Sequence, residues 1–261
     1  MNVCQLLLVC LLCGTAADEQ KADSLFSDML TAPRWEIAPE FSWFRYDEPG
    51  IMKNSGMLYG VAASYTQYKP RRLFRVEGGI SVGEVEYEGS LMDGTPYTMD
   101  GNHDYLLNLR LLWGHLWQDK AWDSQLYTGL GYRFLNDDST QDPHGYARYS
   151  NYFYLPLGLK TYHALDGHWW LTLGAELDVL LIGVQISGIS DGDSSYITNL
   201  QWPGFGARAS VELCRRTRSL DLAIAPFIQY WWVDDSSITS DGWYEPRNNT
   251  LQYGLSLIWR F

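Results

Sequence analysis

The chain has 261 residues, a formal net charge of −12 and 15% aromatic residues, including 12 Trp and 18 Tyr. This acidic balance makes it a poor nucleic-acid binder, because phosphate binding needs clustered Lys and Arg. No apolar run beyond the N-terminus reaches the ~18 residues that a transmembrane helix needs. If the chain spans a membrane it must do so as strands, and girdles of Trp and Tyr would explain the aromatic content.

Residues 1–17 have the pattern of a signal peptide. Leu6–Leu12 is its apolar core, and Thr15-Ala16-Ala17 supplies small residues for cleavage. Three of the four cysteines lie in this segment, so the mature chain keeps only Cys214 and no intrachain disulfide is expected. We interpret residues 18–34, which are polar with scattered apolar side chains, as a periplasmic tail.

From residue 35 onward, segments of about ten residues alternate between apolar and polar side chains. A strand directs successive side chains to opposite faces, so this pattern indicates membrane strands with one face in lipid. We predict ten strands, at residues 35–46, 56–68, 73–88, 105–116, 124–135, 152–162, 168–182, 200–213, 220–232 and 251–261.

The later strands alternate most clearly. In the strand at 168–182, every second residue from Trp169 to Leu181 is apolar, whereas Glu176 and Asp178 lie on the other face. The strands at 152–162 and 220–232 repeat this arrangement. Such strands predict a barrel with an apolar exterior and a polar interior.

The strand at 73–88 departs from this alternation. Its apolar positions change phase near Gly83, where Val85 and Tyr87 take over. A phase change of this kind predicts a β-bulge, in which one extra residue enters one of the paired strands.

The predicted connections alternate in length. The long ones are 47–55, 89–104, 136–151, 184–199 and 233–250, and the short ones are 69–72, 117–123, 163–167 and 214–219. This alternation is typical of outer-membrane barrels, with long loops outside and short turns in the periplasm. The long loops hold fourteen acids and three bases, so we assign nearly all of the net negative charge to the external side.

The strand at 251–261 ends the chain on an aromatic-rich face. Its ending resembles the C-terminal signature of bacterial outer-membrane barrels, in which a terminal Phe is read by the barrel-assembly machinery. The resemblance implies an assembly signature made of Tyr253, Leu255, Leu257, Trp259 and Phe261.

Further stretches extend this resemblance over about residues 35–261. They are Asp47-Glu48-Pro49-Gly50, residues 131–138, residues 150–154, Pro226-Phe227-Ile228 and residues 245–250. They look like a family of small uncharacterised outer-membrane β-barrels of Gram-negative bacteria. The resemblance implies a location in the bacterial outer membrane, with membrane lipid, lipopolysaccharide and the assembly machinery as partners. That family has no established activity that could be transferred.

The polar strand faces would line the barrel interior. Their charged residues form a lumen charge network of seven acids and six bases: Glu36, Glu40, Arg75, Glu77, Arg110, Arg133, Lys160, Glu176, Asp178, Arg208, Glu212, Asp221 and Arg260. Confined charges are costly unless paired, so the near-equality of sign suggests ion pairs across the interior. We interpret the network as a core that braces and occludes a small barrel. The alternatives are a narrow ion or solute path and an interior acid–base site.

The acidic loops are candidates for binding Ca²⁺ or Mg²⁺. Asp191-Gly192-Asp193 and Asp137-Asp138 are the best matches, but neither has a full calcium-loop spacing. We therefore interpret these residues as solvated loop surface and expect no metal and no cofactor.

An outer-membrane enzyme is the rival class of function. Proteases of the omptin type pair acids on one loop with an Asp-x-His on another, whereas here the fourth loop has no His and the second has only His103-Asp104. A lipid-modifying hydrolase or acyltransferase needs a His and a Ser held together, for which His144 and Ser150 are candidates. No phosphate loop or metal-ligand cluster appears, so we assign no catalytic residue. A third class is a binding or adhesion protein that acts through the acidic loops.

Together these patterns predict an all-β fold. The expected architecture is a monomeric, transmembrane, antiparallel up-and-down β-barrel of ten strands at residues 35–261. A closed barrel leaves no free sheet edge.

Overall fold

A computed structural model describes residues 33–91, 93–117, 122–166, 168–188, 196–217, 220–240 and 242–261. The predicted signal peptide and nearly all of the predicted tail lie outside these residues. No helix in the described part of the chain is long and apolar enough to cross a membrane. Every regular element described there is a β-strand.

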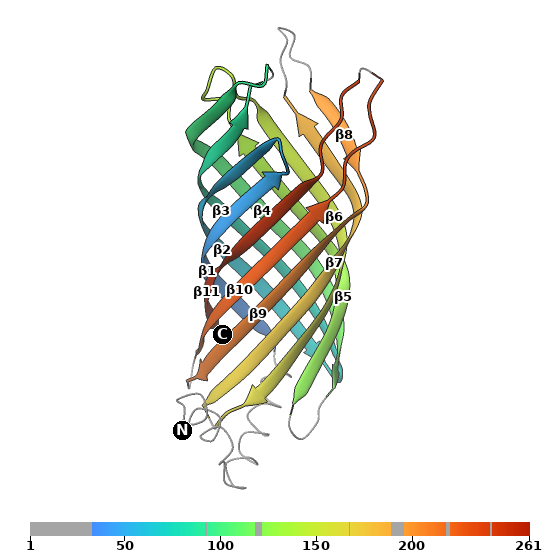
Figure 1. Cartoon of the computed structure of the whole chain (residues 1–261). Helices are drawn as coiled ribbons and strands as arrows, with labels where there is room; N and C mark the ends of the chain where they lie inside the picture. The colour runs from blue at the N-terminus through green and yellow to red at the C-terminus, as the bar shows by residue number, and fades with distance from the viewer. Residues whose placement is uncertain are drawn as a thin grey trace, which may run out of the picture.

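The strands form one closed antiparallel barrel (Figure 1). They are β1 (Arg34–Glu48), β2 (Met52–Lys69), β3 (Arg72–Ser90), β4 (Pro96–Trp117), β5 (Asp123–Asp138), β6 (Ala147–Ala164), β7 (Trp169–Ser187), β8 (Ile197–Gln201), β9 (Gly204–Arg216), β10 (Asp221–Val233) and β11 (Asn248–Arg260). Neighbours in sequence pair with each other, and β11 pairs with β1 to close the sheet at what we call the seam. The predicted closed barrel is thereby confirmed.

The predicted number of ten strands is also confirmed, because β8 and β9 count as one. Both pair with β7, at successive positions along it. They are separated at Trp202–Pro203, where proline has no N–H to donate to a neighbouring strand.

The two ends of the barrel differ. The start of β1 and the end of β11 lie at one end, which we call the terminal end, and we call the opposite one the loop end (Figure 1). At the loop end the connections are 49–51, 91–95, 139–146, 188–196 and 234–247, shorter than predicted. The strands extend past their predicted ends because side chains continue to alternate there, with polar groups now outside and both apolar and charged groups inside.

Strand β3 shows this inversion and corrects the prediction of a phase change near Gly83. Val85 and Tyr87 point into the barrel, like the buried Leu73 earlier in the strand. The outward side chains in this part of the strand are Glu84, Glu86 and Glu88. The apolar residues there belong to the interior, so the strand never changes phase. A register shift does exist between Val85 and Tyr87, but the extra residue belongs to β4, near Gly101 with its φ of +73°.

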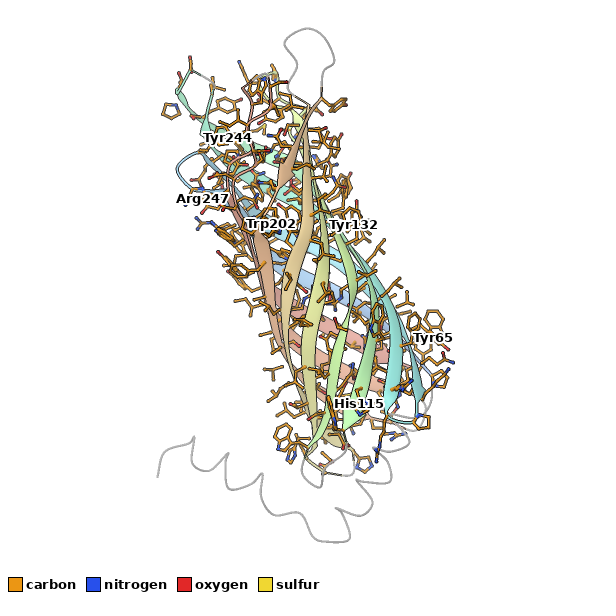
Figure 2. The ribbon with its side chains drawn as sticks, turned by 90° about the vertical axis from the view of Figure 1, so that its right-hand side faces the viewer. Tyr65, His115, Tyr132, Trp202, Tyr244 and Arg247 are labelled. Carbon is orange, nitrogen blue, oxygen red and sulfur yellow. The ribbon has the colours of Figure 1, made fainter. Side chains whose placement is uncertain are left out.

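The outer wall carries a continuous apolar belt. On β4 its side chains run from Tyr105 to Trp117, about 40 Å along the strand at ~3.4 Å per residue. Aromatic residues lie toward both edges, with Trp202 and Tyr132 nearer the loop end and His115 near the terminal end (Figure 2). The belt is the outward apolar face that the alternation predicts.

The interior has three levels along the barrel, and β3 contributes inward residues to each of them. At the terminal end, Leu73 belongs to a cluster that we call the terminal-end plug: Leu73, Leu116, Trp170 and Cys214. Next come the polar positions of a central chamber, from Arg75 to Ser81. Val85 then belongs to the first of two clusters that we call together the loop-end plug: Phe44, Tyr46, Met52, Leu58, Val85, Leu106 and Leu135, with Tyr152, Tyr154, Leu180, Trp231 and Val233.

Candidate functional site

The central chamber has a volume of about 210 Å³. Small inward residues such as Ala38, Ala62, Ser210 and Ala225 leave this space within the barrel. Ten charged residues line it: Glu36, Glu40, Arg75, Glu77, Arg110, Lys160, Glu176, Arg208, Glu212 and Arg260. The five acids balance the five bases, so the chamber is polar with no net charge.

Glu36 organises the half of the chamber nearer the terminal end. Its carboxylate accepts hydrogen bonds from Nη2 of Arg75 at 2.6 Å and from Nε of Arg260 at 2.7 Å. Arg260 also donates to both oxygens of Glu212, at 2.6 Å each, and Arg75 Nε lies 2.9 Å from Glu77. Because Glu36 and Arg260 face each other across the seam, this pair joins the two strands that close the barrel.

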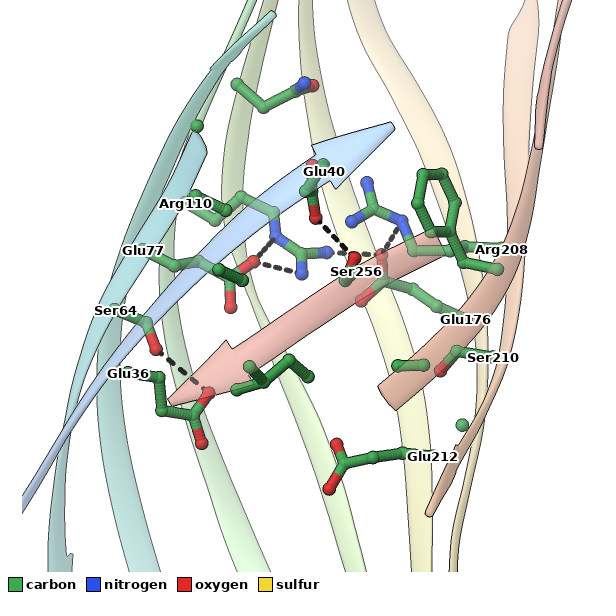
Figure 3. A pocket seen from close by; sticks show the side chains of 18 of the residues that line it. Glu36, Glu40, Ser64, Glu77, Arg110, Glu176, Arg208, Ser210, Glu212 and Ser256 are labelled. Carbon is green, nitrogen blue, oxygen red and sulfur yellow. Dashed lines mark hydrogen bonds and ion pairs between the residues drawn. The ribbon is translucent and has the colours of Figure 1, made fainter. Parts of the chain in front are cut away.

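Arg110 organises the other half (Figure 3). Its guanidinium is buried and forms ion pairs with both Glu77 and Glu176. Glu176 also accepts a hydrogen bond from the hydroxyl of Tyr127 at 2.7 Å and lies 3.5 Å from Nε of Arg208. Such multiply bonded pairs offset the desolvation that each charge undergoes in the barrel.

Two charged groups of the chamber stand outside these pairs. No carboxylate of the described residues lies within 4.0 Å of Nζ of Lys160, and Glu40 accepts a hydrogen bond at 2.8 Å only from Ser256. These groups need solvation, and a volume of about 210 Å³ has room for roughly seven water molecules at ~30 Å³ each. The chamber is thus suited to hold water.

The other three predicted interior charges lie beyond the chamber. Arg133 sits in the loop-end plug, 5.6 and 6.0 Å from the centroids of two aromatic rings, with no described carboxylate within 4.0 Å. Asp178 is fully buried, and neither of its oxygens has a hydrogen-bond partner among the described residues. Asp221 pairs with Arg34 at 2.9 Å near the terminal end.

A second charged group, the mouth cluster, lies inside the loop end: Glu48, Asp104, Asp137, Arg148 and Glu245. Arg148 Nη1 lies 2.6 Å from Glu48, and Arg148 Nη2 lies 2.6 Å from Asp137. Glu245, on the connection 234–247, is buried beside them. Burial, together with the negative charge of Glu48, raises the pKa of Glu245 to about 8.

The mouth cluster corrects the sequence interpretation, which placed these acids on solvated external loops. The missed signal was the alternation itself, because Tyr46 and Glu48 continue the inward series of the buried Phe44. Asp137 likewise faces inward, whereas its neighbour Asp138 is outward and bonds Thr140. The other candidate metal motif, residues 191–193, lies outside the described residues.

The candidate catalytic pairs are not brought together. His103 is exposed on the outer face of β4, whereas Asp104 next to it points inward and is fully buried. His144 is exposed on a connection beside Asp142 at 3.4 Å, whereas Ser150 is buried inside β6. Within the described ranges, no three His, Cys, Asp or Glu side chains are placed to hold a metal ion.

The residues of the assembly signature lie on and beside β11. Tyr253, Leu255, Leu257 and Trp259 face outward along the strand. Phe261 exchanges two backbone hydrogen bonds with Trp35 of β1, at 3.0 and 3.1 Å. The end of the strand is therefore fixed against the first strand at the terminal end.

No family model and no curated protein matches the chain in sequence. Solved structures do match its fold, and they are outer-membrane barrels of bacteria. The outer-membrane protease OmpT from Escherichia coli has a TM-score of 0.55 at 9% identity, over 88% of this chain and 96% of that chain. OprG from Pseudomonas aeruginosa has a TM-score of 0.40 at 9% identity, over 88% and 97% of the two chains. The Pseudomonas putida toluene transporter TodX has a TM-score of 0.37 at 12% identity, over 87% and 89%.

These identities are low, so the likeness to OmpT concerns the fold alone. The fold is that of the barrels found in bacterial outer membranes. The resemblance to small uncharacterised barrels remains a prediction, since no sequence family matches.

Proposed function

We propose that this chain is a monomeric integral protein of the bacterial outer membrane, with its terminal end in the periplasm and its loop end at the cell surface. The apolar belt supports this placement. About 40 Å of strand, tilted by ~40° as in membrane barrels, spans about 30 Å, which matches the ~25 Å apolar band of such proteins. The residues from Tyr253 to Phe261 then serve as the assembly signature.

We further propose that the barrel is occluded at rest and acts as a braced structural barrel rather than an open channel. The observation that carries this proposal is the pair of plugs. In the loop-end plug Phe44, Leu58, Tyr152 and Tyr154 are fully buried, although each points into the lumen. An open, water-filled pore would leave such inward side chains accessible to solvent.

The plugs make an ion path costly. A permeating ion would have to leave the polar chamber and cross layers of apolar side chains without hydration, and hydrophobic constrictions of this kind stop conduction by excluding water. The ion pairs from Glu36 to Arg208 connect residues of β1, β3, β4, β7, β9 and β11 across the interior. Their role in this proposal is to hold the wall around the chamber.

The test is conductance of the refolded protein in a planar lipid bilayer at several salt concentrations. We expect no discrete current steps from the natural sequence. Steps whose size follows the salt concentration would refute occlusion and favour the narrow channel lined by the same charges.

A second variant tests whether an absence of current is caused by the loop-end plug. Truncating two large residues of the loop-end plug, Phe44→Ala with Trp231→Ala, should let water into the lumen and produce intermittent steps. The matched control truncates two outward residues of similar size, Phe41→Ala with Trp43→Ala, and should stay silent. If the plug variant folds and is also silent, the plug is not the barrier that we propose.

A further inference from the structure

We propose that the hairpin tip between β2 and β3 binds the phosphate group of an anionic phospholipid. This tip consists of Lys69, Pro70, Arg71 and Arg72 at the terminal end. The inference rests on the proposed membrane location and adds a specific lipid site to it.

The bases of the tip form a row on the outer wall. Lys69 is the cross-strand partner of Arg72, and Arg72 is the cross-strand partner of His115 on β4. All three are exposed and face outward, because Leu73 and Leu116 beside them point into the barrel. His115 marks this level near the terminal end in Figure 2. Three adjacent strands therefore present basic groups side by side.

The row lacks the acids that accompany bases at the other end of the barrel. No carboxylate of the described residues lies within 4.0 Å of Lys69, Arg71 or Arg72, whereas Arg45 pairs with Asp47 at 3.0 Å and Lys53 with Glu88 at 2.7 Å. Like charges directly opposite each other on paired strands repel. An anion held between Lys69 and Arg72 would remove that repulsion.

The backbone of the tip also favours a role for Arg71. Its φ is +58°, in the left-handed region, and among the described residues it is the one non-glycine residue with positive φ. Pro70 before it suits the first central position of a tight turn, and glycine would suit the second. Arginine at that second position is strained, but it places a third basic side chain at the tip.

The position of the row selects a lipid headgroup over a soluble anion. The next outward residues toward the belt are Phe74 and Trp113, which are cross-strand partners with 43% and 48% exposure. They lie two residues along the strands, about 7 Å from the basic row. A phospholipid whose tail covers these two rings would bring its phosphate to the level of Lys69 and Arg72.

The test is native mass spectrometry of the folded protein in detergent with added phosphatidylglycerol or phosphatidylcholine. We expect the natural sequence to bind one phosphatidylglycerol more tightly than phosphatidylcholine. Near a membrane each basic residue strengthens binding of anionic lipid about fivefold, so the triple variant Lys69→Gln, Arg71→Gln, Arg72→Gln should lose about 100-fold. The matched control is Arg45→Gln, Lys53→Gln, Arg247→Gln, which removes as many bases from the loop end and should keep the preference.

Equal losses in the two triple variants, or none in either, would overturn the proposal. Displacement of the lipid by a short acidic peptide at equal concentration would also overturn it, in favour of an acidic protein partner. Arg71→Gly separates lipid binding from stability, since it should relax the turn and raise the thermal midpoint while weakening lipid binding about fivefold. A protein that does not fold in detergent or lipid at all would instead contradict the proposed membrane location.

Discussion

Replacing Arg110 by Met tests whether the interior ion pairs brace the barrel. The substitution keeps the length of the side chain but removes a buried guanidinium that binds both Glu77 and Glu176. Breaking a buried pair costs about 3–5 kcal/mol, because a charge is left without compensation. Glu77 keeps Arg75 at 2.9 Å, and Glu176 keeps Tyr127 at 2.7 Å, so we expect the lower value, about 3 kcal/mol.

The matched control makes the same substitution on the outer wall. Arg45 pairs with Asp47 at 3.0 Å, but its side chain is 47% exposed. Exposed pairs contribute little, so Arg45→Met should cost less than about 1 kcal/mol. Both values come from urea unfolding of the protein in lipid vesicles, extrapolated to zero urea.

A double variant sharpens the result. Adding Glu176→Gln to Arg110→Met removes one of the two carboxylates that lose their Arg110 partner. This should recover about 1–2 kcal/mol of the lost free energy of unfolding. If Arg110→Met costs no more than Arg45→Met, or if the second substitution deepens the loss, the ion pairs do not brace the barrel and the reasoning fails.

Three further predictions concern other parts of the interior. The pKa of Glu245 is about 8 in the folded protein and ~4.3 in an unfolded chain, so the folded state holds the proton more tightly. Its contribution to stability is therefore complete below pH ~4.3 and falls by about 1.4 kcal/mol per unit up to pH 8, and Glu245→Gln should abolish that slope when unfolding is measured from pH 5 to 9. A Cβ at Gly158 would overlap the ring of Tyr127, whereas at Gly79 its nearest contact is 3.4 Å. We expect Gly158→Ala to cost about 1–3 kcal/mol in urea unfolding and Gly79→Ala clearly less, and equal costs would contradict this packing. The thiol of Cys214 is fully buried, so a maleimide should label it only after unfolding, and rapid labelling of the folded barrel would show an accessible terminal-end plug.

The fold could be predicted from the sequence because an apolar outer face opposite a largely polar interior gives each strand a two-residue period. In β7, for example, the apolar series from Trp169 to Leu181 marks the outer face, and Glu176 and Asp178 between its members mark the inner face. The strand ends could not be placed in this way. Beyond the apolar belt the outer face becomes polar, whereas the inner face takes both kinds of residue, so that Val85 and Glu48, one apolar and one acidic, both point inward.

The pairing of the interior charges was also beyond prediction. Alternation brings Arg110 and Glu176 to the same side of the wall, but they are 66 positions apart in the chain. Which acid meets which base depends on the stagger between strands and on the curvature of the closed sheet. Neither quantity leaves a local signal in the sequence. Arg133 illustrates this, because it lies against aromatic rings and meets no carboxylate of the described residues.

The seam sets the order in which this chain can gain its structure. Every other strand pairing joins segments that follow one another closely, so those hairpins can form early, as each new segment becomes available. Glu36 and Arg260 are 224 positions apart, and their contact must wait for β11. Contacts of such long sequence separation carry a large loop-closure entropy and slow the folding reaction. Until that last step, β1 and β10 expose unpaired backbone edges through which the molecule can pair with other molecules. Pairing of β11 with both strands removes these edges and prevents such association.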